Sequence, residues 1–339
     1  MLSRALNTKP RRSIRYTEGS CRSSLSLCEY DEIFMGCMEN EVVVPCDGIV
    51  VEEDGGVRWR LKDVMGASVG VVGESVLGVT EKVVFSDGTC SVLKRFRAVC
   101  VRRREFGRRV TLLATIGQRC DYLVPMKAYL YSKRFKFVVC DYYPMGSLYD
   151  LLIGAREHDH TPLSWKHRLK IILHIAKAIG FIHSQSPSRD RNMIMNVHGN
   201  LKTSNIMVDV DFNAYLSNYG FPQLAVEVPD TGQRRSPSPP SPLPSPCEPL
   251  SQNNDIYHFG IIILDILGGS KALESIECGF ERKDEIKVKE CAIFEFPFEG
   301  KDRRKVWKIW NMALACINSS HEARPSIECI LLHLTKLYT

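Results

Sequence analysis

The hydrophobic period of the sequence changes near Gly146, and this change limits the fold more than any other feature. Before it, short β-branched runs such as "EVVVPCDGIVV" and "KRFKFVVCDYY" alternate with turns, and "SDG" between two apolar runs predicts a hairpin. One helix is expected in this part, over about residues 101–116. After Gly146, apolar residues recur every three or four positions, as in "LSWKHRLKIILHIAKAIGFIHSQ". The pattern predicts an α+β fold, in which a small β-rich lobe precedes a larger helical lobe.

The expected lobes cover residues 41–142 and 143–339, after a disordered basic tail over residues 1–40. The tail is rich in Arg and Ser, which also permits an organelle transit peptide, and the sequence leaves both interpretations open. No apolar run reaches the roughly 18 residues that a membrane span requires. The 13 cysteines are odd in number and lack metal-site spacing. We therefore expect a cytoplasmic protein, with the inner face of the plasma membrane as a second location, and no metal site.

An arginine-rich stretch, "RFRAVCVRRREFGRR", lies at the start of the helix expected in the small lobe. It carries Arg95, Arg97, Arg102, Arg103, Arg104, Arg108 and Arg109. The net charge of the whole chain is only +6, which by itself gives no reason to expect nucleic acid as a partner. The stretch is either the solvated face of a helix or a site for an anionic membrane surface or an acidic partner.

A second unusual segment, "TGQRRSPSPPSPLPSPCEPL", is dense in Pro and Ser and predicts a disordered, exposed loop over residues 229–250. It contains four Ser-Pro steps, at the candidate phosphosites Ser236, Ser238, Ser241 and Ser245. Each phosphate would add roughly −1.5 to −2 charge, which favours a role as a docking tag. Docking of "PPSPLP" in a proline-binding groove and an unconstrained loop are the alternatives.

The order of motifs from about Trp59 to Leu337 resembles a protein kinase domain of the plant leucine-rich-repeat receptor-like kinase group. The matching stretches are "RLKDVMGASVGVVGESVLG", "DYYPMGSLYDLL", "LSWKHRLKIILHIAKAIGFIH", "VHGNLKTSNIMVD", "DIYHFGIIILDILGG" and "EARPSIECI". One such motif is weak, but six in the right order are specific. The resemblance implies the bilobal kinase fold, with residues 229–250 in the activation segment.

The resemblance also implies a set of nucleotide-binding positions, which are Gly73, Gly78, Lys94, Cys140, Lys202 and Asn205. Gly73 and Gly78 belong to the phosphate-covering loop, although Ser75 replaces its middle glycine. An ordinary hairpin explains that stretch equally well. Lys94 matches the lysine that pairs with phosphates, and a surface or loosely held lysine is the alternative. Cys140 stands at the gatekeeper position of the pocket, where a small side chain leaves room.

Three acids that phosphoryl transfer needs are absent, because Thr111, Asn200 and Asn218 stand at their positions. Thr111 cannot pair with Lys94 as the helical glutamate of the family does. The amide of Asn200 cannot take a proton from a substrate hydroxyl, and loss of a general base costs about two to four decades in rate. Asn218 offers magnesium no carboxylate, the ligand that this cation prefers. We expect weak ATP binding at most, without magnesium.

The residues that hold the kinase fold persist at His198, Gly220, Asp255 and Arg324, and Glu248 is a candidate partner for Arg324. A retained scaffold without its acids predicts a pseudokinase that acts as a signalling scaffold or allosteric partner of other protein kinases or receptor-like kinases. The alternatives are a weak or unconventional Ser/Thr kinase that transfers the ATP γ-phosphate, a nucleotide-sensing switch, and a decoy or adaptor.

Overall fold

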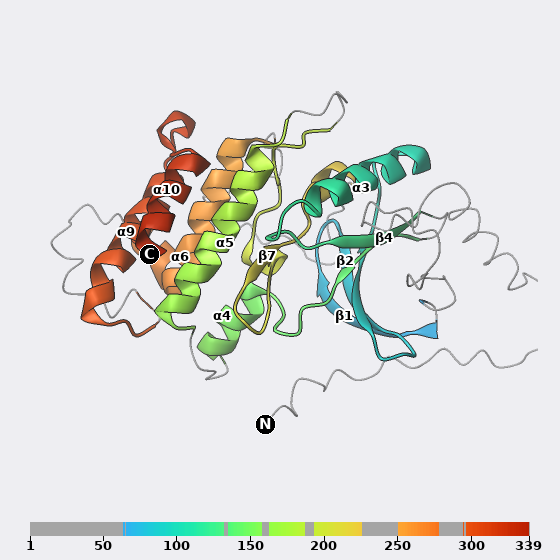
Figure 1. Ribbon diagram of the computed structural model, residues 1–339, viewed down its shortest axis with the longest axis horizontal. Coiled ribbons are helices and arrows are strands. Elements are labelled where there is room, and N and C mark those ends of the chain that lie inside the picture. Colours follow the sequence, from blue (N-terminus) through green and yellow to red (C-terminus); the bar gives the residue numbers. More distant parts are fainter. Residues whose placement is uncertain are drawn as a thin grey trace, which may run out of the picture.

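The computed structural model describes residues 64, 66–131, 135–157, 163–186, 193–225, 250–277, 294 and 296–338. They form two lobes, a β-sheet lobe and a helical lobe (Figure 1). The stretch "VHGNLKTSNIMVD", residues 197–209, corresponds to the catalytic loop of the kinase family and lies between them; we call it the catalytic-loop segment. The predicted tail over residues 1–40, the run "EVVVPCDGIVV" and the four candidate phosphosites lie outside the described residues. No helix in the described ranges is long and apolar enough to cross a membrane.

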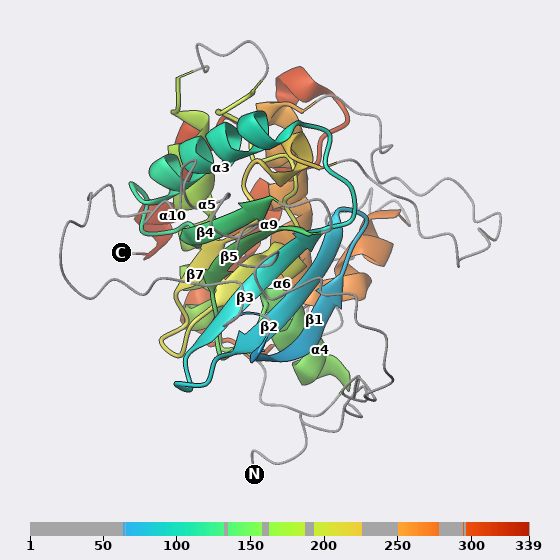
Figure 2. The same cartoon turned by 90° about the vertical axis from the view of Figure 1, so that its right-hand side faces the viewer.

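The small lobe is an antiparallel sheet of five strands in the order β1-β2-β3-β5-β4 (Figure 2). Its strands are β1 (Ser68–Glu74), β2 (Gly78–Val84), β3 (Cys90–Phe96), β4 (Met126–Tyr131) and β5 (Lys136–Asp141). The "SDG" turn joins β2 to β3, as predicted. One face of the sheet buries a compact cluster that includes Val83, Leu93 and Phe137. The other face receives the helix α3, which contacts β4.

Helix α3 (Arg103–Gly117) starts two residues after the predicted position, because Arg102 is extended with φ −73° and ψ 162°. Its apolar residues recur at helical spacing and bury one face through Phe106, Val110 and Leu113, each at most 2% exposed. The helix therefore lies between the sheet and the start of the large lobe, where it can position residues on both sides of the cleft.

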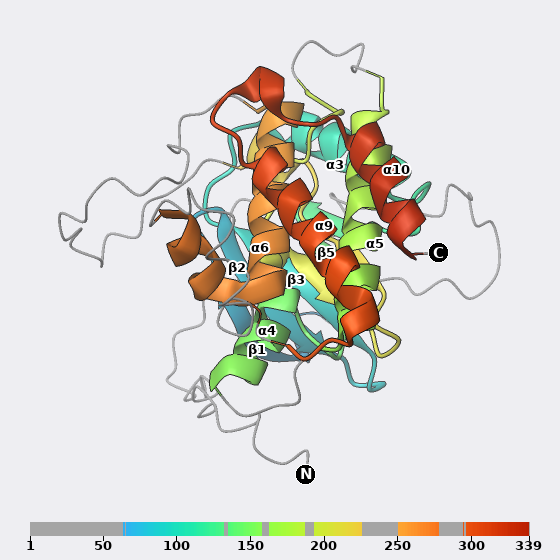
Figure 3. The same cartoon turned by 90° about the vertical axis from the view of Figure 1, so that its left-hand side faces the viewer.

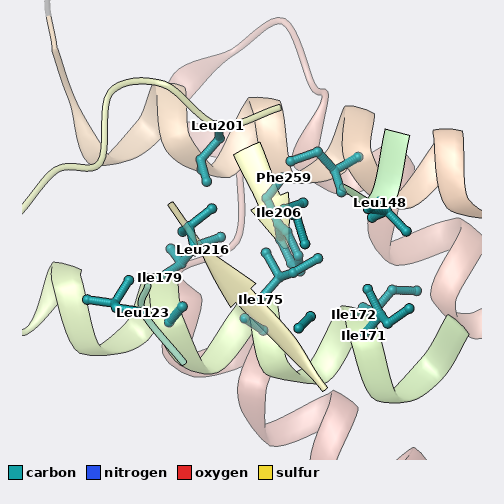
Figure 4. Packing of buried hydrophobic residues seen from close by; sticks show 14 of the residues in the cluster. Leu123, Leu148, Ile171, Ile172, Ile175, Ile179, Leu201, Ile206, Leu216 and Phe259 are labelled. Carbon is teal, nitrogen blue, oxygen red and sulfur yellow. The ribbon is translucent and has the colours of Figure 1, made fainter. Parts of the chain in front are cut away.

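The large lobe consists mainly of the helices α4 (Leu148–Glu157), α5 (Trp165–His183), α6 (Gln252–Glu277), α9 (Gly300–Cys316) and α10 (Ile327–Tyr338). Helix α9 packs on α6, and α10 packs on α5 (Figure 3). Ser164 caps α5 by accepting a hydrogen bond from the His167 N–H. The α5 residues Ile171, Ile175 and Ile179 are at most 1% exposed and form the centre of the core (Figure 4).

A short hairpin, β6 (Ile206–Val208) and β7 (Ala214–Leu216), covers α5 on the side of the small lobe. The catalytic-loop segment includes β6, and the segment that carries Asn218 follows β7. The hairpin brings these two segments together, and the Ser217 N–H donates to the Asn205 carbonyl at 2.8 Å; we call this region between the lobes, with Lys94, the cleft.

Candidate functional site

Asp255 at the start of α6 holds the catalytic-loop backbone. Its carboxylate oxygens accept hydrogen bonds from the N–H groups of His198 (2.7 Å) and Gly199 (2.9 Å). His183, at the end of α5, places its Nε2 3.0 Å from the same carboxylate. Asp255 is 1% exposed, and these three contacts give its buried carboxylate hydrogen-bond partners. The kinase resemblance implied a structural role for Asp255, and here its contacts join α5, α6 and the loop.

His198 is locked in one orientation by both of its ring nitrogens. Nε2 lies 3.0 Å from the Ser217 carbonyl, and Nδ1 accepts the Asn200 N–H at 3.1 Å. The first contact needs a protonated Nε2 and the second an unprotonated Nδ1, which fits the neutral ring. Burial lowers the pKa of His198 to about 4. A neutral His198 therefore supports the loop at physiological pH.

Gly199, where the family has an arginine, adopts the left-handed region with φ 75°. Glycine enters this region without steric cost. A Cβ here would lie 2.6 Å from Leu250 Cδ2. A larger residue would have to displace Leu250, and the chain has no side chain at this position to hold a phosphate.

Asn200, Asn205 and Asn218 are connected by two hydrogen bonds. Asn218 Nδ2 donates to Asn205 Oδ1 (2.7 Å), and Asn205 Nδ2 donates to the Asn200 carbonyl (2.7 Å). Asn218 and Asn205 occupy the two metal-ligand positions of the family, and here an amide–amide hydrogen bond joins them. The described residues hold no group of three His, Cys, Asp or Glu side chains arranged for a metal. These residues do not fit magnesium, which prefers carboxylate oxygens.

Lys94 on β3 is 9% exposed, so the surface-lysine alternative is wrong. Among the described residues it has no ion-pair or hydrogen-bond partner. Burial lowers the pKa of Lys94, and the Lys202 ammonium acts in the same direction. The Oδ1 atom of Asn218 is also buried without a partner. Ser217 Oγ is buried without a partner as well, so two oxygens of the segment after β7 are unsatisfied, while Lys94 has no acceptor among the described residues.

The helix α3 offers Lys94 no carboxylate. Thr111 Oγ1 donates to the Gly107 carbonyl of its own helix at 2.9 Å. Glu105 is hydrogen-bonded to Arg108 and Arg109, and these contacts lower its pKa to about 2. The first-turn glutamate is therefore engaged on another face, as the spacing along the helix predicts.

The phosphate-covering loop, which joins β1 to β2, closes as a tight hairpin. Ser75 and Gly78 exchange two backbone hydrogen bonds of 2.8 and 3.1 Å. A Cβ on Gly78 would lie 1.9 Å from the Arg95 carbonyl oxygen, so only glycine fits there. Gly73 lies on β1 with open space around it, and the Leu77 side chain is buried. The backbone of this stretch is that of an ordinary hairpin, and its second strand, β2, pairs with β3, where Thr80 is the register partner of Lys94.

Cys140, at the gatekeeper position on β5, is buried, and burial raises the pKa of its thiol to about 11. The cavity that it shares with Met126 and Asn218 has a volume of only about 10 Å³. Such a space holds about one water molecule. The room that the small side chain was expected to leave is therefore filled by its neighbours. A cavity of about 690 Å³ lies instead around Trp165 and Tyr338, far along α5 from the cleft.

Sequence reasoning missed a set of contacts that fastens the small lobe to the segment after Gly220. We call this set the interlobe clasp, formed by Val99, Cys100 and Arg109 with Gln223, Leu224 and Ala225. The Cys100 N–H donates to the Leu224 carbonyl (3.1 Å). Val99 pairs with Ala225 in an isolated antiparallel bridge. Arg109 Nη1 donates to the Gln223 carbonyl at 2.6 Å.

Aromatic packing supports the interlobe clasp. The Phe96 ring lies 5.2 Å from Phe221 and 5.7 Å from Phe106, so β3, α3 and the segment after Gly220 share one cluster. Gly220 itself lies against Leu113 of α3. Arg109 is 8% exposed, which corrects its assignment to a solvated helix face. No local pattern in the sequence predicts the clasp, because its partners are more than a hundred residues apart and use backbone atoms.

Arg324 donates to the carbonyls of Asn318 (2.8 Å) and Asn253 (3.0 Å), and it lies over the Tyr257 ring. Its candidate partner Glu248 lies outside the described residues. Arg324 thus ties the loop before α10 to the start of α6, which is a structural role.

The family model for the protein tyrosine and serine/threonine kinases matches residues 70–334. A probable inactive receptor kinase of Arabidopsis thaliana, RLK902, is 33% identical over 64% of the chain and 32% of its own length. Another probable inactive receptor kinase of that plant is 28% identical over 83% of the chain and 44% of its own length. The chain thus spans less than half the length of these curated relatives.

Two solved structures share the fold. The pseudokinase domain of BIR2, an immune regulator of the RLK/Pelle family, superposes with a TM-score of 0.63 at 24% identity, covering 84% of this chain and 88% of that one. The kinase domain of maize SIRK1 bound to AMP-PNP gives a TM-score of 0.63 at 21% identity, covering 84% and 98%. The chain belongs to the protein kinase family, and relatives that it matches are plant receptor kinases named as inactive.

Proposed function

We propose that the protein is a pseudokinase that acts as a signalling scaffold or allosteric partner of other kinases. One observation carries the proposal. The three positions that need an acid hold the neutral side chains of Thr111, Asn200 and Asn218, and none of them offers a carboxylate to Lys94, a substrate hydroxyl or a metal. Phosphoryl transfer depends on positioning and charge stabilisation, so each loss impairs it separately.

The interlobe clasp supports the scaffold role. In an active kinase, the ion pair between the β3 lysine and a helical glutamate must be in place. Here hydrogen bonds and aromatic contacts position α3 without that ion pair. A constant shape suits a protein that works by presenting a surface to a partner.

The decisive experiment measures incorporation of labelled phosphate from ATP into the full chain and a generic substrate, with magnesium or manganese. We expect none above the level of the Lys94→Met variant, which reports contaminating kinases. The double variant Asn200→Asp with Asn218→Asp should also stay inactive, because Thr111 still leaves Lys94 without a partner and such effects are far from additive. Turnover that disappears only in Lys94→Met would overturn the proposal in favour of a weak kinase.

A second candidate is a nucleotide-sensing switch, favoured by the unpartnered Lys94. A buried ammonium without a partner is costly, and the phosphates of a nucleotide would satisfy it. A thermal-shift titration with ATP tests this, because a ligand of the native state raises the melting temperature by mass action. We expect a weak shift that magnesium does not increase. A clear gain with magnesium would contradict it, since that needs an anionic metal ligand in the cleft.

The partners that we propose are other protein kinases or receptor-like kinases on the cytoplasmic side of the membrane, which is the type of protein found among the relatives. The Ser/Pro segment is the proposed docking tag. Replacing Ser236, Ser238, Ser241 and Ser245 by Ala should lower capture of a phosphorylation-dependent partner and leave the melting temperature unchanged. A large fall in melting temperature would show that the segment is structural.

A further inference from the structure

A cavity of about 690 Å³ lies in the large lobe, where the first turns of α5 and α9 meet the last turn of α10. Figure 1 shows α9 and α10 on the side of this lobe that faces away from the β-sheet. Ligand pockets in proteins typically enclose about 300–1,000 Å³, so this space has room for a small molecule. We call it the helix-end cavity, and six of its lining residues are Trp165, Lys166, Leu169, Phe298, Lys305 and Tyr338.

Aromatic and apolar side chains form one part of the helix-end cavity. Trp165 and Leu169 lie four residues apart on α5 and are each 6% exposed, so they form its deep side. Trp165 is held by Phe296, whose ring stacks on the indole with centroids 5.9 Å apart and 5° between the planes. Phe298 is half-buried, and Tyr338 is exposed at the rim. Flat aromatic groups pack well on such rings, which favours an aromatic ligand.

Charged side chains form the other part of the cavity. Lys166 on α5 and Lys305 on α9 line it, and within the described ranges neither ammonium has an ion-pair or hydrogen-bond partner. Two acids also line the cavity, but each has a positive neighbour. Glu299 contacts Lys301 at 2.7 Å, and Asp302 lies in the first turn of α9, where the partial positive charge of the helix end favours a carboxylate. The two lysines are therefore the groups that remain to meet a charged ligand.

We propose that the helix-end cavity binds a small aromatic anion, a flat ring system that carries a carboxylate or a sulfonate. The ring packs on Phe298 and Tyr338 and covers the deep apolar side of the cavity. The acid group lies between Lys166 and Lys305, where it accepts charge-assisted hydrogen bonds from both ammonium groups. The cavity shares no lining residue with the small space beside Cys140 in the cleft, so the ligand and a nucleotide do not compete.

The test is a fluorescence titration of the full chain with 8-anilinonaphthalene-1-sulfonate, an aromatic anion whose emission rises in apolar surroundings. The variant K166Q/K305Q removes both ammonium groups from the cavity. The matched control, R304Q/K308Q, removes two positive charges from exposed positions of α9 outside the cavity, so the two variants have equal net charge. None of the four side chains is buried, so both variants should melt with the wild-type protein.

We expect the dissociation constant to rise about tenfold in K166Q/K305Q and to stay near wild type in the control. Tyr338→Ala should weaken binding and Tyr338→Phe should not, because the ring and not the hydroxyl packs on the ligand. The aromatic carboxylate 1-naphthoate should displace the probe, and its neutral analogue 1-naphthalenemethanol should displace it less well. ATP should leave the probe bound.

Several results would overturn the proposal. The cavity is not the site if the probe does not bind, if both double variants lose affinity equally, or if K166Q/K305Q or Tyr338→Ala binds as the wild type does. Displacement by ATP would place the probe in the cleft. Equal displacement by 1-naphthalenemethanol would show that the acid group is not recognised, and tighter binding of the aliphatic carboxylate decanoate than of 1-naphthoate would show that the ligand is not aromatic.

Discussion

Two regions differ in whether their buried polar groups have partners. The first, which we call the brace, consists of Asp255, His198 and their hydrogen-bond partners, and the second is the cleft beside Lys94. In the brace, both carboxylate oxygens of Asp255 and both ring nitrogens of His198 have partners within 3.1 Å. Beside the cleft, the ammonium of Lys94 and the Oδ1 atom of Asn218 have none among the described residues. Both regions come from motifs of the same family, yet only the first is complete by itself.

The difference separates the residues that hold the fold from those at positions that serve a ligand in the kinase family. A buried polar group without a partner costs free energy, so groups that support the fold are paired within the chain. A group that is paired only by a ligand stays costly in the free protein. The brace therefore contributes stability, while Lys94 has no acceptor among the described residues through which it could contribute.

The largest expected effect is that of Asp255→Ala, which tests the brace. The substitution leaves the N–H groups of His198 and Gly199 buried without an acceptor. We expect a loss of about 3–5 kcal/mol in the free energy of unfolding, measured by urea denaturation. Asp265→Ala on the same helix is the control, because its ion pair with Arg156 is partly exposed and should cost at most about 1 kcal/mol. Equal losses in the two variants would show that the brace contributes no more to the free energy of unfolding than a partly exposed ion pair.

The pH dependence of stability tests the neutral state of His198. Its pKa falls from 6.5 to about 4 on folding, so the unfolded chain binds more protons between these values. Stability should therefore rise from pH 4 to 6.5, by up to about 1.4 kcal/mol per pH unit from this residue. Thermal or urea unfolding of wild type and His198→Gln across this range measures the difference. The same slope in both proteins would contradict the assignment.

Lys94→Met should stabilise the protein, in contrast to substitutions in the brace. Methionine keeps the length of the side chain and removes an unpaired ammonium, which is worth about 1–3 kcal/mol near neutral pH. Folding lowers the pKa of Lys94, so the wild-type chain gains stability as pH rises toward 10.5 and the advantage of Lys94→Met should shrink. The exposed Lys308→Met is the control. A destabilised Lys94→Met would reveal a partner within the chain.

The smallest expected effect concerns the interlobe clasp. Arg109→Ala removes the hydrogen bond to the Gln223 carbonyl and should cost about 1–2 kcal/mol. Amide hydrogen exchange should become faster at Cys100 and Leu224 while the brace stays protected. Arg108→Ala, which removes an exposed pair with Glu105, should change neither. If exchange rises equally in the brace, the clasp and the brace form one cooperative unit.

Much of the fold followed from the sequence because its signals are local. The apolar spacing of "LSWKHRLKIILHIAKAIGFIHSQ" placed the helix α5, and the "SDG" turn placed the β2–β3 connection. The order of motifs assigned Asp255 to the residues that hold the fold. The start of α3 differed by two residues, since the extended Arg102 has no signal in the apolar pattern.

The partners of the site residues did not follow from the sequence. Lys94 had two open interpretations, and only the packing around β3 showed that it is buried. The small side chain of Cys140 predicted an open pocket, but side chains from α3, β4 and the segment after β7 fill the space around it. Arg109 belonged to an arginine-rich stretch, and the fold alone brought Gln223 to it.

The sequence by itself determined which chemical groups stand at each position, including the absence of three acids and the presence of Lys94. Chemical identity is a property of each residue, so it needs no coordinates. The tertiary structure decided which polar groups are paired, since pairing depends on atoms from segments distant in the chain meeting within about 3 Å. Asp255 has three such partners, Arg109 donates to the Gln223 carbonyl, and Lys94 is buried without a hydrogen-bond partner among the described residues.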